Sequence, residues 1–154
     1  MSLVLDCSVA LAWLMPDEQA STAQAVLDRV VASRAWVPSL WHLEIGNSLT
    51  AAVHRKPIDA TFRDAPLADL AMLNIQVDPD THRFIWTDTL RLAQTYPLTL
   101  YDASYLELAM RLSLPLATAM PNRGLPPPHA VFPCWVEAGC IPTQKTSRDG
   151  DCPV

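Results

Sequence analysis

Three acidic residues lie at the ends of predicted elements or among apolar residues, where an unpaired carboxylate is costly. Asp6 follows the apolar run Leu3-Val4-Leu5, Glu44 lies within an apolar stretch, and Asp102 stands in the first turn of a predicted helix. Carboxylate oxygens are the ligands that Mg²⁺ and Mn²⁺ prefer. If the three side chains converge, the simplest chemistry is metal-assisted hydrolysis, because a bound cation activates water and neutralises a phosphodiester oxygen.

Each acid also has a plainer explanation that the sequence leaves open. Asp102 could serve only as a helix N-cap, and Glu44 could be an exposed residue on an amphipathic helix. Asp6 is harder to explain in this way. It closes a predicted buried strand, at the carboxyl edge where open parallel sheets place their sites.

The elements that must position these acids alternate between strand and helix up to residue 118. Short apolar runs predict strands at 3–5, 35–37, 75–77 and 115–118, with 75–77 at a sheet edge. Three-four apolar spacing and capping residues predict helices at 8–15, 18–32, 39–52, 58–73, 83–95 and 99–113, with Ser8 and Ser39 as N-caps and a break at Pro66. This alternation predicts an α/β fold, a three-layer α/β/α sandwich around a central parallel sheet.

The chain changes character after residue 118. Seven of the 14 prolines lie from Pro121 onward, and no helical or strand period is sustained there. We therefore predict one domain over 1–118 and an atypical Pro-rich tail over 119–154 that is loop or disordered. Within the tail, residues 130–132 could pair at a sheet edge.

Composition excludes several classes of protein. A chain of 154 residues with 50% hydrophobic and 18% charged residues is too apolar to be intrinsically disordered. A net charge of −5 argues against a basic nucleic-acid wrapper, and no apolar run is long enough to span a membrane. Cys7 is predicted to be a buried small hydrophobe, and a zinc site from His129 with the tail cysteines 134, 140 and 152 is disfavoured. A reduced, cytoplasmic protein is expected.

Four ordered segments carry a family resemblance. They are VLDCSVA at 4–10, PSLWHLEIGN at 38–47, LTLYDASYLELA at 98–109 and LPLAT at 114–118. Each is weak alone, but their order and spacing resemble PIN-domain proteins, specifically VapC-type ribonuclease toxins of type II toxin–antitoxin systems. The resemblance covers residues 1–118.

The resemblance implies a PIN-like fold and an endoribonuclease that uses Mg²⁺ or Mn²⁺ to hydrolyse RNA. It assigns metal binding and catalysis to the three acids Asp6, Glu44 and Asp102. It assigns an assisting polar role to Ser8, Asn47 and Thr118. It also implies a homodimer that is neutralised by a cognate VapB-type antitoxin, which would present an arginine to the carboxylates.

The chain departs from the family where a fourth acid is expected. That place is taken by Met120, and the last helix and strand of the pattern are replaced by the Pro-rich tail. A second reading frame over this region permits an Asp-Ala start and an Ala-rich run, so we hypothesise that the tail is a frameshifted C-terminus. Resequencing the coding DNA tests this hypothesis.

Two other functions stay open at this point. The chain could be a catalytically impaired PIN remnant that keeps antitoxin binding and dimerisation. A phosphate-accepting regulator also fits an aspartate at a strand end, but it is disfavoured because Lys56 is the only lysine before residue 145.

Overall fold

The protein is described here by a computed structural model. It describes residues 2–14, 21–55, 61–119 and 135–136. The predicted strand pairing at 130–132 and most of the tail, Met120 included, lie outside the described residues.

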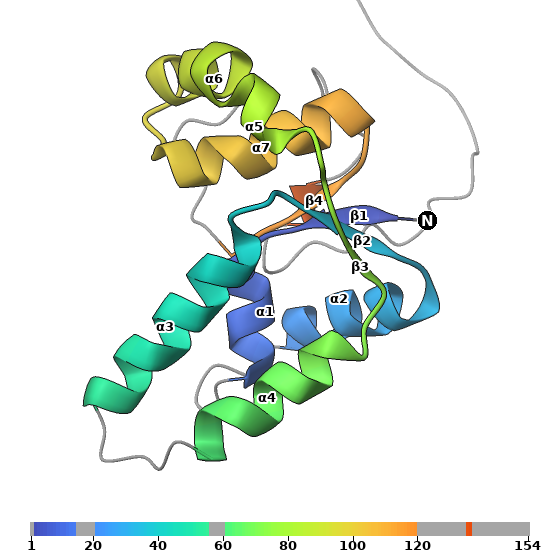
Figure 1. Cartoon of the computed structure of the whole chain (residues 1–154). Coiled ribbons are helices and arrows are strands. Elements are labelled where there is room, and N and C mark those ends of the chain that lie inside the picture. Colours follow the sequence, from blue (N-terminus) through green and yellow to red (C-terminus); the bar gives the residue numbers. More distant parts are fainter. Residues whose placement is uncertain (1, 15–20, 56–60, 120–134, 137–154) are drawn as a thin grey trace, which may run out of the picture.

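A parallel sheet forms the centre of the molecule (Figure 1). Its strands lie in the order β3-β2-β1-β4-β5, and every neighbouring pair is parallel. Their bounds are β1 Leu3–Leu5, β2 Ala35–Val37, β3 Ile75–Val77, β4 Leu116–Ala117 and β5 Trp135–Val136. The predicted strands are confirmed, and β3 is at the edge as expected. The short strand β5, which comes from the tail, was not predicted.

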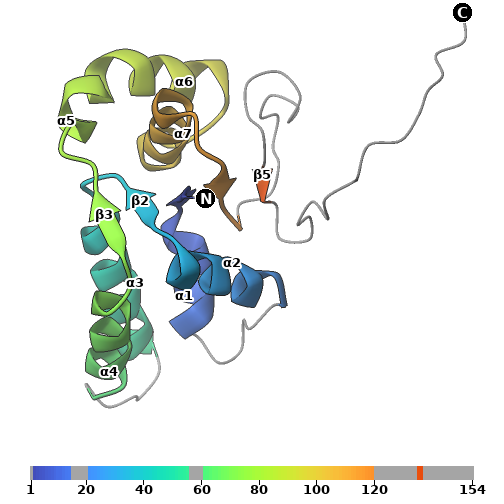
Figure 2. The same ribbon diagram turned by 90° about the vertical axis from the view of Figure 1, so that its right-hand side faces the viewer.

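Helices cover the sheet on both faces, which confirms the predicted α/β/α sandwich (Figures 1 and 2). One layer holds α1 (Cys7–Leu14), α2 (Ser21–Ala32), α3 (Trp41–Arg55) and α4 (Thr61–Ala71). The other holds α5 (Thr81–Phe84), the π-helical turn η2 (Ile85–Thr89), α6 (Leu90–Thr95) and α7 (Leu100–Leu112). Right-handed crossovers explain the two layers, because the chain moves outward from β1 to β3 and then returns past β1 to β4. No helix in the described ranges is long and apolar enough to cross a membrane.

Two local predictions are wrong. Pro66 does not break a helix but lies inside α4. A proline disturbs the carbonyl four residues earlier, which here belongs to the helix's first turn, where little structure is lost. Ser8 is not an N-cap, because α1 already starts at Cys7 and the Asp6 carboxylate accepts the Ser8 N–H at 3.0 Å.

The central strand β1 is wholly buried. Leu3, Val4 and Leu5 are 0% exposed, and the helices on both faces pack against them. With both faces of β1 covered, the chain beyond Leu5 reaches the carboxyl edge of the sheet between the two helical layers. Since β1 lies between β2 and β4, the order of strands reverses here, and such a switch point is where open α/β sheets bind ligands.

Candidate metal and nucleic-acid site

Asp6 and Thr118 meet at this switch point. They follow β1 and β4, which pair side by side, and the Asp6 N–H donates to the Ala117 carbonyl at 3.0 Å. The Thr118 hydroxyl donates to Asp6 Oδ2 at 2.5 Å, while the Ser8 N–H binds Oδ1. Asp6 is 2% exposed. The carboxylate is therefore buried and held in one orientation by two donors.

Glu44 reaches the same region from α3. Its side chain is half-buried, and Glu44 Oε2 accepts a hydrogen bond from the Tyr105 hydroxyl on α7. Tyr105 is 1% exposed, so its ring is part of the core while its hydroxyl fixes the acid. The alternative that Glu44 is only an exposed helix residue is wrong.

Asp102 lies in the first turn of α7. The N-cap of this helix is Thr99, whose hydroxyl accepts the Asp102 N–H at 3.1 Å. The alternative that Asp102 serves only as an N-cap is therefore wrong as well. Its half-buried carboxylate acts electrostatically on both Asp6 and Glu44.

The three acids form one electrostatic unit. Burial raises the pKa of Asp6, its two donors lower it, and the charge of Asp102 raises it further. Burial also raises the pKa of Glu44, against the hydrogen bond from Tyr105, and the charges of Asp6 and Asp102 add to the rise. Among the described residues none of the three pairs with a lysine or arginine. Within these residues no basic side chain offsets the negative charge of the unit, and a bound cation would stabilise it.

The predicted assisting residues divide into two groups. Thr118 contacts Asp6 directly, and Ser8 does so through its N–H, while the Ser8 hydroxyl accepts the Ala119 N–H at 3.1 Å. Asn47 is exposed and makes no hydrogen bond to the three acids within the described ranges. Tyr105 was not predicted from the sequence as a site residue. A tyrosine inside an apolar helix was a usable signal, because a buried tyrosine hydroxyl normally needs a partner.

The oxygen atoms of the three acids are the type of ligand that a hard divalent cation prefers, but the acids do not surround a common point as a closed metal cage would. In the part of the chain that the structure describes, no three His, Cys, Asp or Glu side chains are grouped tightly enough to hold a metal ion. Mg²⁺ does not require such a cage, because it keeps several waters and is commonly held through one or two carboxylates. Asp6, Glu44 and Asp102 supply carboxylate oxygens, the kind of ligand that this mode of binding uses.

A second buried polar network joins α7 to the loop after β3. Arg111 donates to Asp78 Oδ2 at 2.8 Å and to Glu107 Oε1 at 2.7 Å. Its guanidinium also lies 4.4 Å from the centre of the Phe84 ring. The Thr81 hydroxyl donates to Asp78 at 2.8 Å and accepts the Ser39 N–H at 3.2 Å. The network therefore connects α7 with the loops after β2 and β3.

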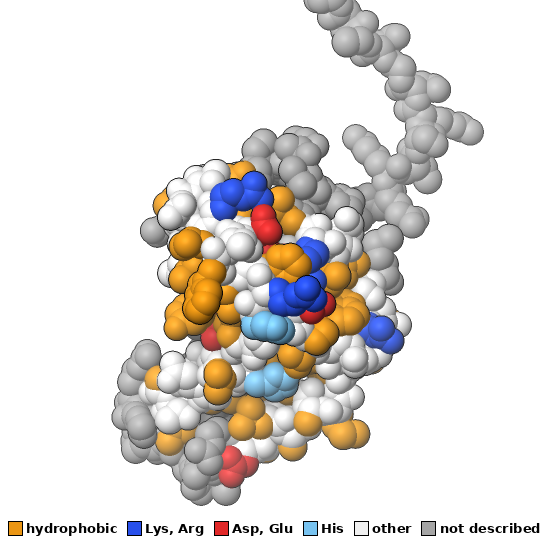
Figure 3. All heavy atoms as spheres, turned by 45° about the horizontal axis from the view of Figure 1, so that its top comes forward, with side chains coloured by type: hydrophobic (Ala, Val, Ile, Leu, Met, Phe, Trp, Pro, Cys, Tyr) orange, Lys and Arg blue, Asp and Glu red, His pale blue; other side chains and the backbone are white. Residues whose placement is uncertain are grey.

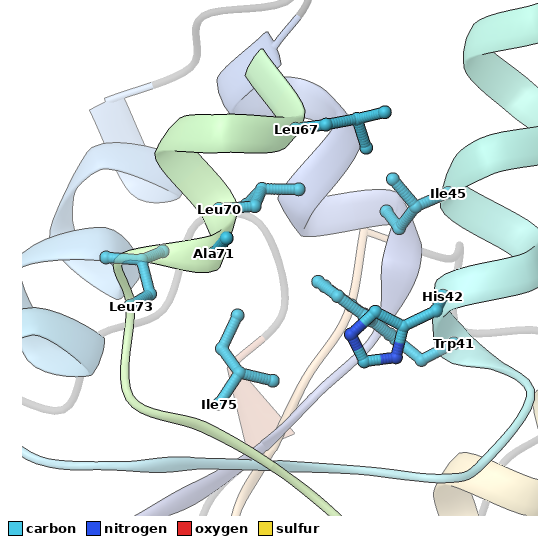
Figure 4. A pocket seen from close by; sticks show the side chains of 8 residues that line it. All are labelled: Trp41, His42, Ile45, Leu67, Leu70, Ala71, Leu73 and Ile75. Atoms are coloured by element: carbon cyan, nitrogen blue, oxygen red, sulfur yellow. The ribbon is translucent and has the colours of Figure 1, made fainter. Parts of the chain in front are cut away.

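An apolar pocket of about 300 Å³ lies between α3, α4 and β3 (Figure 4). Its lining is mainly aliphatic, with one histidine and one tryptophan: Trp41, His42, Ile45, Leu67, Leu70, Ala71, Leu73 and Ile75. It contains no carboxylate and is separate from the three acids. The pocket therefore does not include the candidate acids at the carboxyl edge of the sheet.

Basic side chains on the helical layer formed by α5, η2, α6 and α7 are paired with acids. Arg83 binds Asp80 at 3.3 Å and Arg91 binds Asp88 at 2.6 Å, both exposed. Figure 3 shows Lys and Arg side chains beside Asp and Glu on this face. Such exposed pairs contribute little to stability and leave a mixed surface instead of a strongly basic one.

The sequence matches the PIN domain family over residues 3–119, and the chain belongs to this family. PIN domains are generally nucleases. No curated protein matches the chain in sequence.

Several solved structures share the fold. PAE2754 from Pyrobaculum aerophilum is 22% identical with a TM-score of 0.55, covering 78% of this chain and 80% of that one. VapBC2 from Rickettsia felis, bound to a DNA fragment from its promoter, is 10% identical with a TM-score of 0.58, covering 78% and 89%. A toxin–antitoxin complex from Klebsiella pneumoniae is 18% identical with a TM-score of 0.56, covering 80% and 92%.

Proposed function

We propose that this chain is a divalent-metal-dependent endoribonuclease and the toxin of a toxin–antitoxin pair. The observation that carries the proposal is the unit of Asp6, Glu44 and Asp102 at the topological switch point of a PIN fold. Membership of a family of nucleases supports hydrolysis of a phosphodiester. Two structures of similar fold are toxin–antitoxin complexes, which supports the biological role.

Within this proposal each residue has a stated task. Asp6, Glu44 and Asp102 would hold Mg²⁺ or Mn²⁺, which supplies an activated water and offsets phosphate charge. Thr118 and the Ser8 N–H orient Asp6, and Tyr105 orients Glu44. Pre-set carboxylates need little rearrangement when substrate arrives, which favours catalysis. Asn47 is proposed as an assisting residue at the open side of α3.

The partners follow from the same proposal. The substrate is RNA, and a VapB-type antitoxin would neutralise the enzyme by placing an arginine against the acids. We also propose a homodimer and a cytoplasmic location.

Cleavage of a mixed RNA pool by the purified full chain in Mn²⁺ tests the proposal. We expect fragments that disappear with EDTA and with Asp6→Asn, while Asp69→Asn, an exposed acid on α4, cleaves like the wild type. Cleavage that persists in EDTA, or equally in Asp6→Asn, would contradict it.

A second candidate function rests on Met120, which stands where the family pattern has a fourth acid. A chain with three acids could keep antitoxin binding and dimerisation but lose most cleavage. A folded wild-type chain that does not cleave, together with a Met120→Asp variant that does, would favour this candidate.

A further inference from the structure

Tyr101 is a large exposed aromatic side chain one residue before Asp102, in the first turn of α7. It is 60% exposed, whereas Tyr105, one helical turn further along α7, is 1% exposed. Residues four apart on a helix share a face, with Cβ atoms about 6 Å apart. Because Tyr105 faces Glu44, Tyr101 lies on the same side of α7, one turn nearer the N-terminus of the helix, where its side chain reaches solvent.

The first turn of α7 holds this ring on a fixed backbone. Thr99 caps the helix through the Asp102 N–H, and the Ser104 hydroxyl donates to the Tyr101 carbonyl at 2.6 Å. Tyr101 also precedes Asp102 directly, so the two side chains leave neighbouring positions of the same helical turn. A fixed and exposed aromatic face next to a phosphate site binds at a lower entropic cost than a mobile one.

A second exposed apolar side chain stands next to an acid in the sequence of α3. Leu43 is 77% exposed and precedes Glu44 on α3, as Tyr101 precedes Asp102 on α7. Exposed apolar side chains thus stand next to two of the three acids in sequence. The described surface nearby is mixed in charge, and its exposed arginines 83 and 91 are paired with acids. Contacts to bases can supply the affinity that phosphate contacts to a basic surface would otherwise give.

We propose that Tyr101 is a stacking platform for one unpaired nucleobase of the RNA next to the bond that is cleaved. The inference rests on the proposed function. Stacking on an exposed aromatic ring needs a base that is free of a duplex, so Tyr101 selects single-stranded RNA. Tyr101 is one residue from a candidate metal ligand, and its flat ring suits a flat nucleobase. An aliphatic side chain of a peptide partner could pack equally well on a residue that has no ring.

Fluorescence of a single-stranded RNA oligomer of mixed sequence, carrying 2-aminopurine at several positions, tests the stacking. Ca²⁺ replaces Mg²⁺ during the titration, and a gel verifies that the RNA stays intact. We expect the wild type and Tyr101→Phe to quench the probe and to bind within about twofold of each other. Tyr101→Ala should quench little and bind about 5- to 160-fold more weakly, the range for loss of one base–aromatic stack.

Two further variants separate a ring from mere bulk and from a general surface effect. Tyr101→Leu keeps apolar volume without a ring and should bind more weakly than Tyr101→Phe. Trp86→Ala removes an aromatic side chain that is 87% exposed on η2, outside the turn that carries Asp102, and should bind as the wild type does. Since Tyr101 is exposed, all Tyr101 variants should keep the wild-type circular dichroism.

Three results would overturn the inference. The first is equal RNA binding by Tyr101→Ala and the wild type. The second is equal RNA binding by Tyr101→Leu and Tyr101→Phe. The third is that Tyr101→Ala weakens a dimer or an antitoxin complex but leaves RNA binding unchanged. Cleavage in Mn²⁺ is measured on the same proteins. Ring-dependent quenching without cleavage would reject the proposed nuclease and keep the stacking site, whereas cleavage with ring-independent binding would do the reverse.

Discussion

At the scale of single residues, the site depends on uncharged donors that hold charged acceptors. Thr118 and the Ser8 backbone hold Asp6, and Tyr105 holds Glu44. A hydrogen bond to a charged group contributes about 1.5–3 kcal/mol, more than one between neutral groups. These donors therefore balance part of the cost of burying carboxylates beside one another.

Tyr105→Phe removes only the hydroxyl that binds Glu44. We expect the free energy of unfolding to fall by about 1–2 kcal/mol at neutral pH, because Glu44 is half-buried and water replaces part of the bond. The bond favours ionised Glu44. The difference should therefore shrink as the pH falls through the raised pKa of Glu44 and the carboxylate is protonated. Urea unfolding in EDTA at several pH values measures this.

Tyr96→Phe is the matched control, since Tyr96 is half-buried and lies outside the site. It should change stability by less than about 0.5 kcal/mol at every pH. A Tyr105→Phe loss that is independent of pH would show that the hydroxyl does not act through Glu44.

Asp6→Asn is expected to stabilise the metal-free chain at neutral pH. The folded-state pKa of Asp6 is raised, so the folded chain disfavours its charge, and stability is lost as the pH rises through that pKa. A neutral amide avoids this loss: its oxygen accepts the Ser8 N–H, and its NH₂ group donates to the Thr118 hydroxyl oxygen, which then accepts instead of donating. Thermal unfolding in EDTA should give a higher midpoint for Asp6→Asn than for the wild type, with the gap closing on acidification. A lower midpoint for Asp6→Asn in EDTA would contradict the account.

At the scale of elements, α7 joins the two polar regions of the molecule. Its first turns carry Asp102 and Tyr105, and its last turns carry Glu107 and Arg111. Arg111 ties the helix to Asp78 after β3, and Thr81 continues the connection to the Ser39 N–H after β2. The network thereby fixes α7 against the strand ends from which α3 and Glu44 start.

Asp78→Asn and Glu107→Gln should lower the free energy of unfolding by different amounts, although both acids bind Arg111. Asp78 receives bonds from both Arg111 and Thr81, so its neutralisation should lower the free energy of unfolding by about 3 kcal/mol. Burial raises the pKa of Glu107 despite Arg111, so its charge is disfavoured in the folded chain. Glu107→Gln should therefore cost much less at neutral pH. Urea unfolding of the two variants measures the difference, and equal losses would contradict this ranking.

The sequence was a good guide to elements and a poor guide to contacts between them. Apolar runs located β1 to β4, and Thr99 with its apolar helix located α7 to within a residue. The bond between Tyr105 and Glu44 spans 61 residues of sequence, and that between Arg111 and Asp78 spans 33. Such pairs depend on how helices pack, which no local pattern encodes, so the networks around the predicted acids had to come from the structure.

At the scale of the whole molecule, the central question is what three acids can do without a fourth. The expected fourth position is Met120, and the frameshift hypothesis explains its loss without changing residues 1–118. Fewer carboxylates mean less negative charge to attract a divalent cation. The enzyme and the impaired remnant therefore differ in degree of metal binding, which can be measured.

Met120→Asp restores the acid that the family resemblance implies at this position. If that acid completes the site, the variant should cleave RNA at least tenfold faster in Mn²⁺, a change of about 1.4 kcal/mol in the activation barrier. Rates on one RNA pool at equal protein concentration measure this. Met120→Asn, equally polar but uncharged, is the control and should give a smaller gain, and equal rates for Met120→Asp and the wild type would contradict the expectation.

Isothermal titration calorimetry of Mn²⁺ into the purified full chain is the most direct test of whether Asp6, Glu44 and Asp102 form a metal site. We expect saturable binding by the wild type, binding weakened at least tenfold in Asp102→Asn, and unchanged binding in the surface control Asp69→Asn. Equal Mn²⁺ affinity in all three proteins, or none in a folded wild type, would show that Asp6, Glu44 and Asp102 do not form a metal site.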